Sequence, residues 1–189
     1  MNGQQTSTSD VVDILTHDHR EMEELLDQIQ ASPDAEQRRD LTDMLIAEVV
    51  RHAVAEEMYL YPVMEKRIPN GTEEAEHDKE EHEEIMQVMK QLEDADTAEP
   101  AFMERMHKLD ELLRHHAKDE EVDQFPKLRE LISAEELIDL GKKIESGKRL
   151  APTRPHPGAP HSELFHKTVG AGVGMIDRLR DKLSGRMTG

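Results

Sequence analysis

Histidine and glutamate recur in this sequence at a spacing that suits metal binding. Residues 52–62 and residues 116–126 both read H-x-x-x-E-E-x-x-x-aromatic-P, 64 residues apart. A shorter pattern, an acidic residue followed by histidine, occurs at residues 18–19 and 81–82, 63 residues apart. The chain therefore contains an internal repeat of two helix pairs, each with one histidine on its first helix and H-x-x-x-E-E on its second.

The repeated side chains can share metal ions. Residues four apart in an α-helix lie on one face, about one turn from each other, so His52 and Glu56 can reach a common ion. The two repeats together supply four histidines and two glutamates of this kind. Six side chains are too many for one tetrahedral zinc ion, and they suit two five- or six-coordinate ions that keep an oxo, hydroxo or open position. Imidazole with bridging carboxylate favours iron over magnesium or calcium, and zinc and manganese accept the same ligands. The predicted metal ligands are His19, His52, Glu56, His82, His116 and Glu120.

Helical phase places one histidine of each predicted helix on the apolar side, and it is the repeated histidine. On the first helix His19 falls in line with Leu15 and Met22, whereas His17 falls with the acidic Asp13 and Glu21. A buried histidine needs a hydrogen-bond partner or another ligand. Metal binding would satisfy the four repeated histidines together, which favours it over four separate core histidines.

On the third predicted helix, the sequence offers more than one candidate metal ligand. Residues 77–81 also read H-x-x-x-E, so His77 or Glu81 could replace or supplement His82. The first pair of repeated histidines is 33 residues apart, and the pair that includes His82 is 34 residues apart. This match of spacings favours His82.

Three further residues have open roles at the predicted site. Glu57 and Glu121 follow the repeated glutamates directly and compete with them as ligands. Tyr59 lies seven residues after His52, on the ligand side of an α-helix, where it is either a donor to a metal ligand or part of the core. Its repeat partner is Asp123, so the two halves are not chemically identical.

Four segments have strong helical periodicity, and signals for strands are nearly absent. Ser9 is a candidate N-cap for the first helix. Pro62 should end or kink the second, because proline lacks an N–H and clashes with the preceding turn. Two similar helix pairs pack naturally as an up-down-up-down four-helix bundle, so the predicted class is all-α. The predicted helices span residues 10–30, 34–61, 72–92 and 100–125.

The C-terminal part of the chain has a different composition. A capping-box pattern at Ser133 and Glu136 predicts a short fifth helix over residues 133–146. A stretch with four prolines, a Gly-rich segment and a short amphipathic stretch follow. The expected organisation is a four-helix bundle over residues 1–132, the additional helix, and an extended Pro/Gly-rich linker with an amphipathic tail over residues 147–189.

The expected tail is basic, whereas the bundle is acidic. Residues 151–189 carry a net charge of +3, which leaves −21 for residues 1–150. Such a tail can fold back onto the bundle, bind a protein partner or contact an acidic membrane surface. Folding back or partial disorder is favoured, since only about nine residues are amphipathic.

The composition excludes several classes of function. A net charge of −18 repels phosphate backbones, so we expect no nucleic-acid binding. The absence of cysteine rules out disulfides and thiolate metal sites. No run of about 18 apolar residues occurs, so we expect no transmembrane segment. The N-terminus lacks the basic and apolar regions of a signal peptide, which predicts a cytoplasmic location.

Four motifs resemble those of the hemerythrin-like family, the HHE cation-binding domains. DHRE, HAVAEEMYLYP, EEHEEI and HHAKDEEVDQFP occur in this order over residues 10–132, and TRPHP with GVGMIDRLRDKLSGR resembles the extension of actinobacterial members. The resemblance implies a left-twisted four-helix bundle that holds a non-haem, oxo- or hydroxo-bridged di-iron centre. By this resemblance the four repeated histidines supply nitrogen ligands, and Glu56 and Glu120 bridge the two ions.

The sequence departs from the oxygen-carrying hemerythrins, which use five histidines. Asp78 and Met86 stand four residues before and after His82, and position 121 is glutamate. The set of four histidines and two glutamates is similar to the ligand set of other family members. Those members are linked to peroxide or nitric-oxide handling, oxygen or iron sensing, and stress response.

We therefore expect a di-iron protein that binds or reacts with O2, H2O2 or NO in oxidative or nitrosative stress. Peroxidase-like, catalase-like or nitric-oxide-handling activity is one interpretation. An iron or oxygen sensor, or an iron-binding protein without turnover, is the alternative.

Overall fold

The chain folds as a set of packed helices. The computed structural model describes residues 9–161 and 170–186, and every regular element within them is helical. The predicted all-α class is confirmed for this part of the chain. Predictions for the N-terminal segment and for parts of the expected tail fall on residues 1–8, 162–169 and 187–189, which lie outside the described residues.

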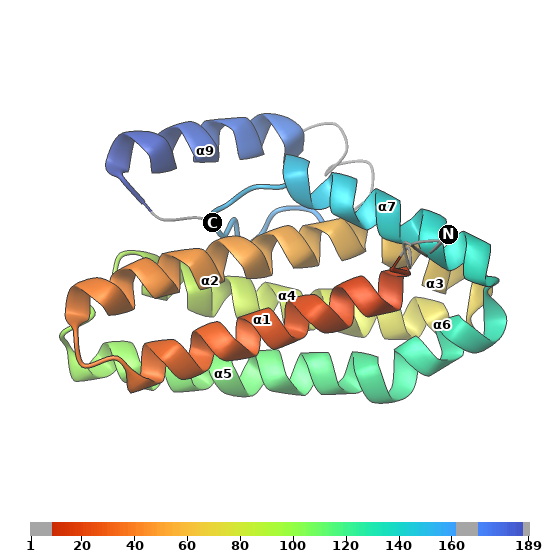
Figure 1. The fold of residues 1–189 in the computed structure, drawn as a ribbon, viewed down its shortest axis with the longest axis horizontal. Helices are drawn as coiled ribbons and strands as arrows, with labels where there is room; N and C mark the ends of the chain where they lie inside the picture. Colours follow the sequence, from red (N-terminus) through yellow and green to blue (C-terminus); the bar gives the residue numbers. More distant parts are fainter. Residues whose placement is uncertain (1–8, 162–169, 187–189) are drawn as a thin grey trace, which may run out of the picture.

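Four long helices lie side by side and form a helical bundle (Figure 1): α1 (Val11–Ala31), α2 (Ala35–Ala55), α4 (Gly71–Glu93) and α5 (Pro100–Asp119). Each packs against two of the others, in the order α1, α2, α4, α5 and back to α1. Short links join α1 to α2 and α4 to α5. Links of this length make neighbouring helices antiparallel.

The first helix begins one residue later than the candidate cap Ser9 predicted. Asp10 is the N-cap of α1: its carboxylate accepts a hydrogen bond from the Asp13 N–H at 2.9 Å. The Asp13 carboxylate accepts one in return from the Asp10 N–H at 3.2 Å. An acidic N-cap also lies favourably at the positive end of the helix dipole.

Both H-x-x-x-E-E repeats leave α-helical geometry at the same point. α2 passes into a π-helical turn, η1 (Glu56–Leu60), and continues as α3 (Tyr61–Arg67). α5 passes into η2 (Glu120–Gln124) and continues as α6 (Phe125–Leu131). In both, the residue after the π turn donates its N–H to the carbonyl of the glutamate five residues earlier. Pro62 therefore ends no helix: the backbone stays helical through α3, because the wider turn accommodates a residue without an N–H.

Apolar side chains form two clusters with a buried polar layer between them. One cluster includes the fully buried Leu26 and Phe102, and the other includes Leu15 and Leu128. Along α1 the buried His19 lies between Leu15 and Leu26. The clusters hold the helices on both sides of the polar layer, so the side chains of that layer have little freedom to move.

The predicted fifth helix is α7 (Ala134–Leu150), which crosses α1 and α2 (Figure 1). Its capping box forms, with the Ser133 hydroxyl accepting from the Glu136 N–H at 3.3 Å. The helix runs to Leu150, beyond the end predicted near residue 146. Gly147 is a close-packed position and not a breaker, since a Cβ there would lie 2.9 Å from the ring of Tyr59.

The chain after α7 returns to the bundle in an extended segment, and α9 (Ala171–Ser184) follows it. Arg154, in the extended segment, connects α4 with α9: its Nη1 lies 2.7 Å from Glu93 and its Nε lies 2.7 Å from Asp181. Arg186 Nη1 also donates to Glu93 at 2.7 Å. Burial opposes ionisation of Glu93, but these charged donors and a neighbouring lysine hold its pKa at about 2. The carboxylate is therefore ionised at neutral pH and anchors the tail.

Two carboxylates of α9 contact the extended segment before it: Asp181 accepts from Arg154 Nε, and Asp177 lies 2.9 Å from His156 Nε2. Asp177 and Asp181 are buried, whereas Met175 and Ile176 are 68% and 62% exposed. The amphipathic stretch predicted in the tail thus contacts the rest of the protein in part through these carboxylates. Among the described helices, none combines the length and the apolar character needed to cross a membrane.

Gly71→Ala is expected to destabilise the fold by about 3 kcal/mol. A Cβ at position 71 would lie 2.0 Å from the carbonyl oxygen of Met64, and a backbone atom cannot rotate away as a side chain would. Asn70, the residue before Gly71, already lies in the left-handed region at φ 61°. Urea unfolding measures the change. Gly172→Ala is the control: its Cβ would enter open space, so stability should change by less than about 1 kcal/mol. Equal stability of the two variants would contradict the close contact.

Candidate metal centre

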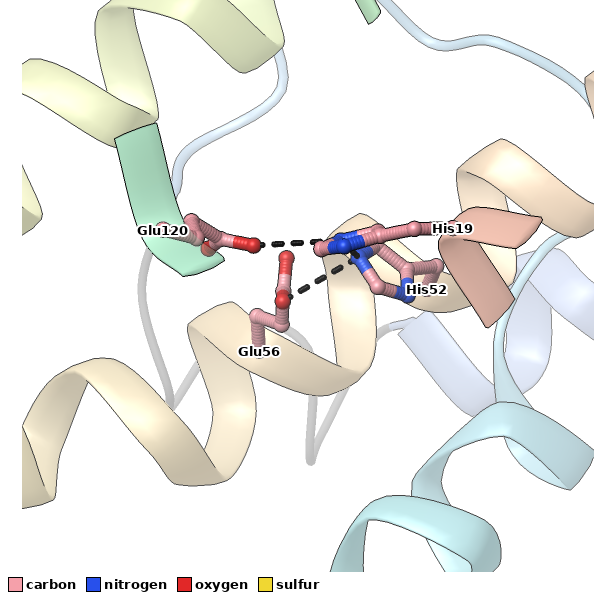
Figure 2. A group of neighbouring side chains, drawn as sticks. All are labelled: His19, His52, Glu56 and Glu120. Carbon is pink, nitrogen blue, oxygen red and sulfur yellow. Dashed lines mark hydrogen bonds and ion pairs between the residues drawn. The ribbon is translucent and has the colours of Figure 1, made fainter. Parts of the chain in front are cut away.

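Four buried side chains from the two repeats converge inside the bundle (Figure 2). His19 comes from α1, His52 from α2, and Glu56 and Glu120 open the two π turns. The Nε2 atoms of the two histidines are 3.2 Å apart. His52 Nε2 lies 3.1 Å from Glu56 Oε1, and His19 Nε2 lies 3.2 Å from Glu120 Oε2. These atoms form one compact group of metal-ligand type.

A second group uses the same two carboxylates. His82 of α4 and His116 of α5 have Nε2 atoms 3.1 Å apart. Glu56 Oε2 lies 3.4 Å from His82 Nε2, and Glu120 Oε1 lies 3.7 Å from His116 Nε2. Each glutamate therefore has one oxygen near each histidine pair. Carboxylates that bridge two metal ions inside a helical bundle need this division of their oxygens.

The donor set fits a pair of cations. All four carboxylate oxygens of Glu56 and Glu120 are buried, and the histidine Nε2 atoms approach them as ion-pair partners without hydrogen-bond geometry. A buried, ionised carboxylate without hydrogen bonds is costly unless a cation compensates it. Four imidazole nitrogens and four carboxylate oxygens suit iron, zinc or manganese. The buried histidine and glutamate clusters thus fit metal-ion binding.

The outer nitrogen of each of the four histidines is held by a carboxylate. Such a contact fixes the proton on Nδ1, leaves the Nε2 lone pair free to face inward, and sets the ring orientation. The four carboxylates come in repeat-related pairs, so the arrangement has approximate twofold symmetry. The Nδ1 contacts are His19 with Glu121 at 2.8 Å, His52 with Asp18 at 3.1 Å, His82 with Glu57 at 3.0 Å and His116 with Glu81 at 2.7 Å.

These contacts place the residues whose roles the sequence left open. Glu57, Glu81 and Glu121 each contact the outer side of a histidine, and not the interior where the Nε2 atoms meet. His77 has a side chain that is 59% exposed, with Nε2 3.5 Å from Glu81. His82 is buried and belongs to the inner group.

Protons compete with cations for this site in the metal-free chain. Burial alone would lower the pKa of His52 and His82, but neighbouring carboxylates outweigh it and raise the pKa of both to about 10. The same balance raises the pKa of His116. Burial opposes the ionisation of Glu56, but the adjacent histidines hold its pKa well below the ordinary value. A metal ion must therefore displace protons from imidazole to bind here.

Two aromatic residues at repeat-related positions flank the histidines. Phe125 stacks on His19 with ring centroids 6.0 Å apart. Tyr61 stacks on His82 at 5.7 Å, and its hydroxyl lies 3.2 Å from His82 Nε2. Burial and nearby carboxylates raise the pKa of the Tyr61 phenol, so it keeps its proton. Tyr59, which the sequence placed on the ligand side, packs instead against Gly147 of α7. The one-residue shift of the π turn is the reason, because it rotates everything after Glu56.

The second half of the site also contains a buried polar pair. Gln124 Nε2 donates to both oxygens of Asp78, at 2.9 and 3.0 Å. Burial and the charge of Glu120 raise the pKa of Asp78 to about 7. At the repeat-related positions stand Leu15 and Leu60. The sequence signalled Asp78 only as a departure from the five-histidine pattern, and it did not signal Tyr61 or Gln124.

A small cavity is lined by all four of these histidines. Its volume is about 20 Å³, and its other walls are mainly apolar, among them Leu26, Val49, Ile85 and Leu113. One water needs roughly 10 to 15 Å³ on this measure, so the cavity has room for one molecule of that size beside the histidines.

The chain is similar in sequence to known proteins. The chain is 29% identical over 174 residues to an uncharacterized hemerythrin-like protein of Schizosaccharomyces pombe, a match that covers 92% of this chain and 86% of that protein. It is 23% identical over 171 residues to a DNA nickase of Nostoc sp., covering 90% of this chain but only 46% of the nickase.

A crystal structure shows the same fold at low sequence identity. A hemerythrin HHE cation binding domain-containing protein from Mycobacterium kansasii matches with a TM-score of 0.66 and 22% identity, over 89% of this chain and 99% of that one. The Hemerythrin HHE cation binding domain profile matches residues 10–128, which confirms the resemblance seen in the motifs. The chain therefore belongs to the hemerythrin HHE cation-binding domain family.

Proposed function

We propose that this protein is a non-haem di-iron protein that binds or reacts with O2, H2O2 or NO in oxidative or nitrosative stress. The observation that carries the proposal is the division of the oxygens of Glu56 and Glu120 between two pairs of histidine nitrogens. His19 and His52 would hold one ion, and His82 and His116 the other. A bound iron pair supplies redox chemistry and an open coordination position.

The residues around the pair would control which molecules reach it. The six ligands are at most 3% exposed, which keeps bulk water away. The small apolar cavity beside the histidines suits a diatomic molecule or peroxide better than an organic substrate. Tyr61 would donate its hydroxyl proton as a hydrogen bond towards the site, next to His82. Asp78, with a pKa of about 7, would hold a proton near Glu120.

The first experiment is the metal content of protein produced in iron-replete medium, with an absorption spectrum. Two irons per chain with an oxo-bridge charge-transfer band support the proposal. The loaded protein is then mixed with O2, H2O2 and NO in a stopped-flow spectrometer, which identifies the reactive ligand. Protein that takes up only zinc, or no metal, under these conditions contradicts it.

Tyr61→Phe is expected to leave the iron content unchanged and to slow the reaction with peroxide about tenfold or more, because a proton donor beside the site is lost. The substitution makes the two halves alike, since phenylalanine already stands at position 125. Tyr59→Phe is the matched control, and it should react like the parent protein. Equal rates for all three proteins would exclude Tyr61 from the reaction.

A sensor function is the second candidate, and one observation favours it. The C-terminal part of the chain contacts two carboxylates that hold metal ligands. Lys148 Nζ donates to Asp18 at 2.6 Å, and His161 Nδ1 lies 2.8 Å from Glu57. A change in the positions of His52 or His82 on metal binding would therefore reach the tail. Limited proteolysis of the metal-free and iron-loaded proteins tests this: a difference in cleavage within residues 151–161 supports sensing, and identical cleavage opposes it.

A further inference from the structure

A second type of metal-ligand cluster lies on the surface where α4 and α5 meet. His77 and Glu81 form an i,i+4 pair on α4, with Nε2 and Oε1 3.5 Å apart. His115 and Asp119 form an i,i+4 pair on α5, with Nε2 and Oδ2 3.5 Å apart. His115 Nε2 also lies 3.6 Å from Glu81 Oε1, so the two pairs meet at this oxygen. Ligand atoms of His77, Glu81 and Asp119 all lie within 4.8 Å of one another.

The cluster has the composition of a transition-metal site and not only of a charged surface. Two imidazoles and two carboxylates are donors that divalent iron, zinc and manganese accept, with water filling the remaining positions. A single exposed pair of this type, such as His17 with Glu21 at 3.4 Å on α1, offers only two ligands. The α4/α5 cluster brings two such pairs together from different helices.

An open hollow adjoins the cluster. Its lining includes His77 and Asp119 together with the acidic Glu73 and Asp123, and it measures about 370 Å³. One water needs roughly 10 to 15 Å³ on this measure, so a hydrated ion fits. The buried Gln124, which holds Asp78, also lines the hollow.

The surface cluster is linked to the interior by shared residues. Glu81 presents Oε1 to His77 and His115, while its Oε2 lies 2.7 Å from Nδ1 of His116. Asp78, Glu81 and His116 form a further compact ligand group, and His116 also belongs to the inner group with Glu56. Three ligand groups therefore follow one another from the surface to the interior, each sharing a residue with the next.

We propose that His77, His115, Asp119 and Glu81 form a third metal site, which takes a divalent transition-metal ion from solution and loads the inner centre. The loading role rests on the proposed di-iron centre, whereas the surface site itself does not. Glu81 is the connecting ligand, because its two oxygens face the two sides.

The surface site is tested by Zn²⁺ titration of iron-loaded protein in a calorimeter. We expect one further Zn²⁺ per chain, and binding at least about 100-fold weaker in His77→Ala/His115→Ala, since loss of a mere supporting contact already costs 10- to 100-fold. Asp119→Asn is a second variant that should also weaken it. His17→Ala/His107→Ala, which removes exposed histidines elsewhere on α1 and α5, is the matched control and should bind as the parent does.

The loading role is tested by the rate of Fe²⁺ uptake into metal-free protein, followed by the appearance of the inner-centre absorption. His77→Ala/His115→Ala should load about tenfold or more slowly and yet reach the same final iron content. No third ion in the parent, or equal Zn²⁺ binding by the variant, overturns the surface site. Unchanged uptake with a lost third ion overturns only the loading role. If no iron enters the parent interior, the di-iron proposal fails and the Zn²⁺ titration, repeated on metal-free protein, decides the surface site.

Discussion

A chain that carries both His52→Ala and His116→Ala is expected to retain no iron at the inner centre and to lose its oxo-bridge absorption band. Each substitution removes one imidazole from one of the two histidine pairs, so neither ion keeps its full ligand set. The effect is large because the remaining ligands are fixed by their outer carboxylates and cannot move to fill the gap. Metal analysis after gel filtration, with the absorption spectrum, measures the loss.

The stability of this double variant separates metal loss from unfolding. Removal of two imidazoles leaves Glu56 and Glu120 buried with fewer cationic neighbours, which is unfavourable. Far-UV circular dichroism checks that the helices remain. Glu120→Gln is the milder alternative, because it keeps the side-chain volume and removes only the charge and one ligand oxygen. His17→Ala/His107→Ala controls for the number of histidines. A folded double variant with two irons per chain would refute the ligand assignment.

The second large effect is on pH dependence: metal should bind more tightly as the pH rises from about 6.5 towards 10. The pKa values of His52 and His82 in the metal-free protein are about 10. Each therefore carries a proton that a metal ion must displace, and the cost of displacement falls as the pH rises. Calorimetry in buffers of different ionisation enthalpy should show net proton release. Affinity that is flat over this range would show that the imidazoles are already neutral.

The same pKa shifts predict that the stability of the metal-free fold decreases as the pH rises. A histidine whose pKa is about 10 in the fold and near 6.5 in the unfolded chain stabilises the fold fully below pH 6.5. That contribution is lost as the pH rises through 10. Removal of metal by a chelator should therefore be most damaging at high pH. At a free metal concentration 100 times the Kd, bound metal adds about 2.7 kcal/mol, which urea unfolding with and without chelator can measure.

The repeat in the sequence was sufficient to predict the helical class, and it favoured the six side chains that meet inside the bundle while it left neighbouring histidine and glutamate residues open as alternatives. The reason is that His52 and Glu56 are four residues apart, about one helical turn, so local geometry alone puts both on one face. The apolar neighbours of His19 likewise mark the inward side of its helix. The four-residue spacing and the apolar neighbours are local features, and they occur in both repeats. They therefore identify the inward-facing side chains even where the ends of the helices are predicted inexactly.

Tertiary structure decided the parts that depend on contacts between helices. Glu57, Glu81 and Glu121 hold histidines of other helices through Nδ1, and no spacing along the chain encodes those pairings. The return of the tail to Glu93 depends on arginines more than 60 residues away. The aromatic residue at the site was also decided at this level. The α-helical period points to Tyr59, but the π turn that follows Ala55 shifts the register by one residue and brings Tyr61 to His82.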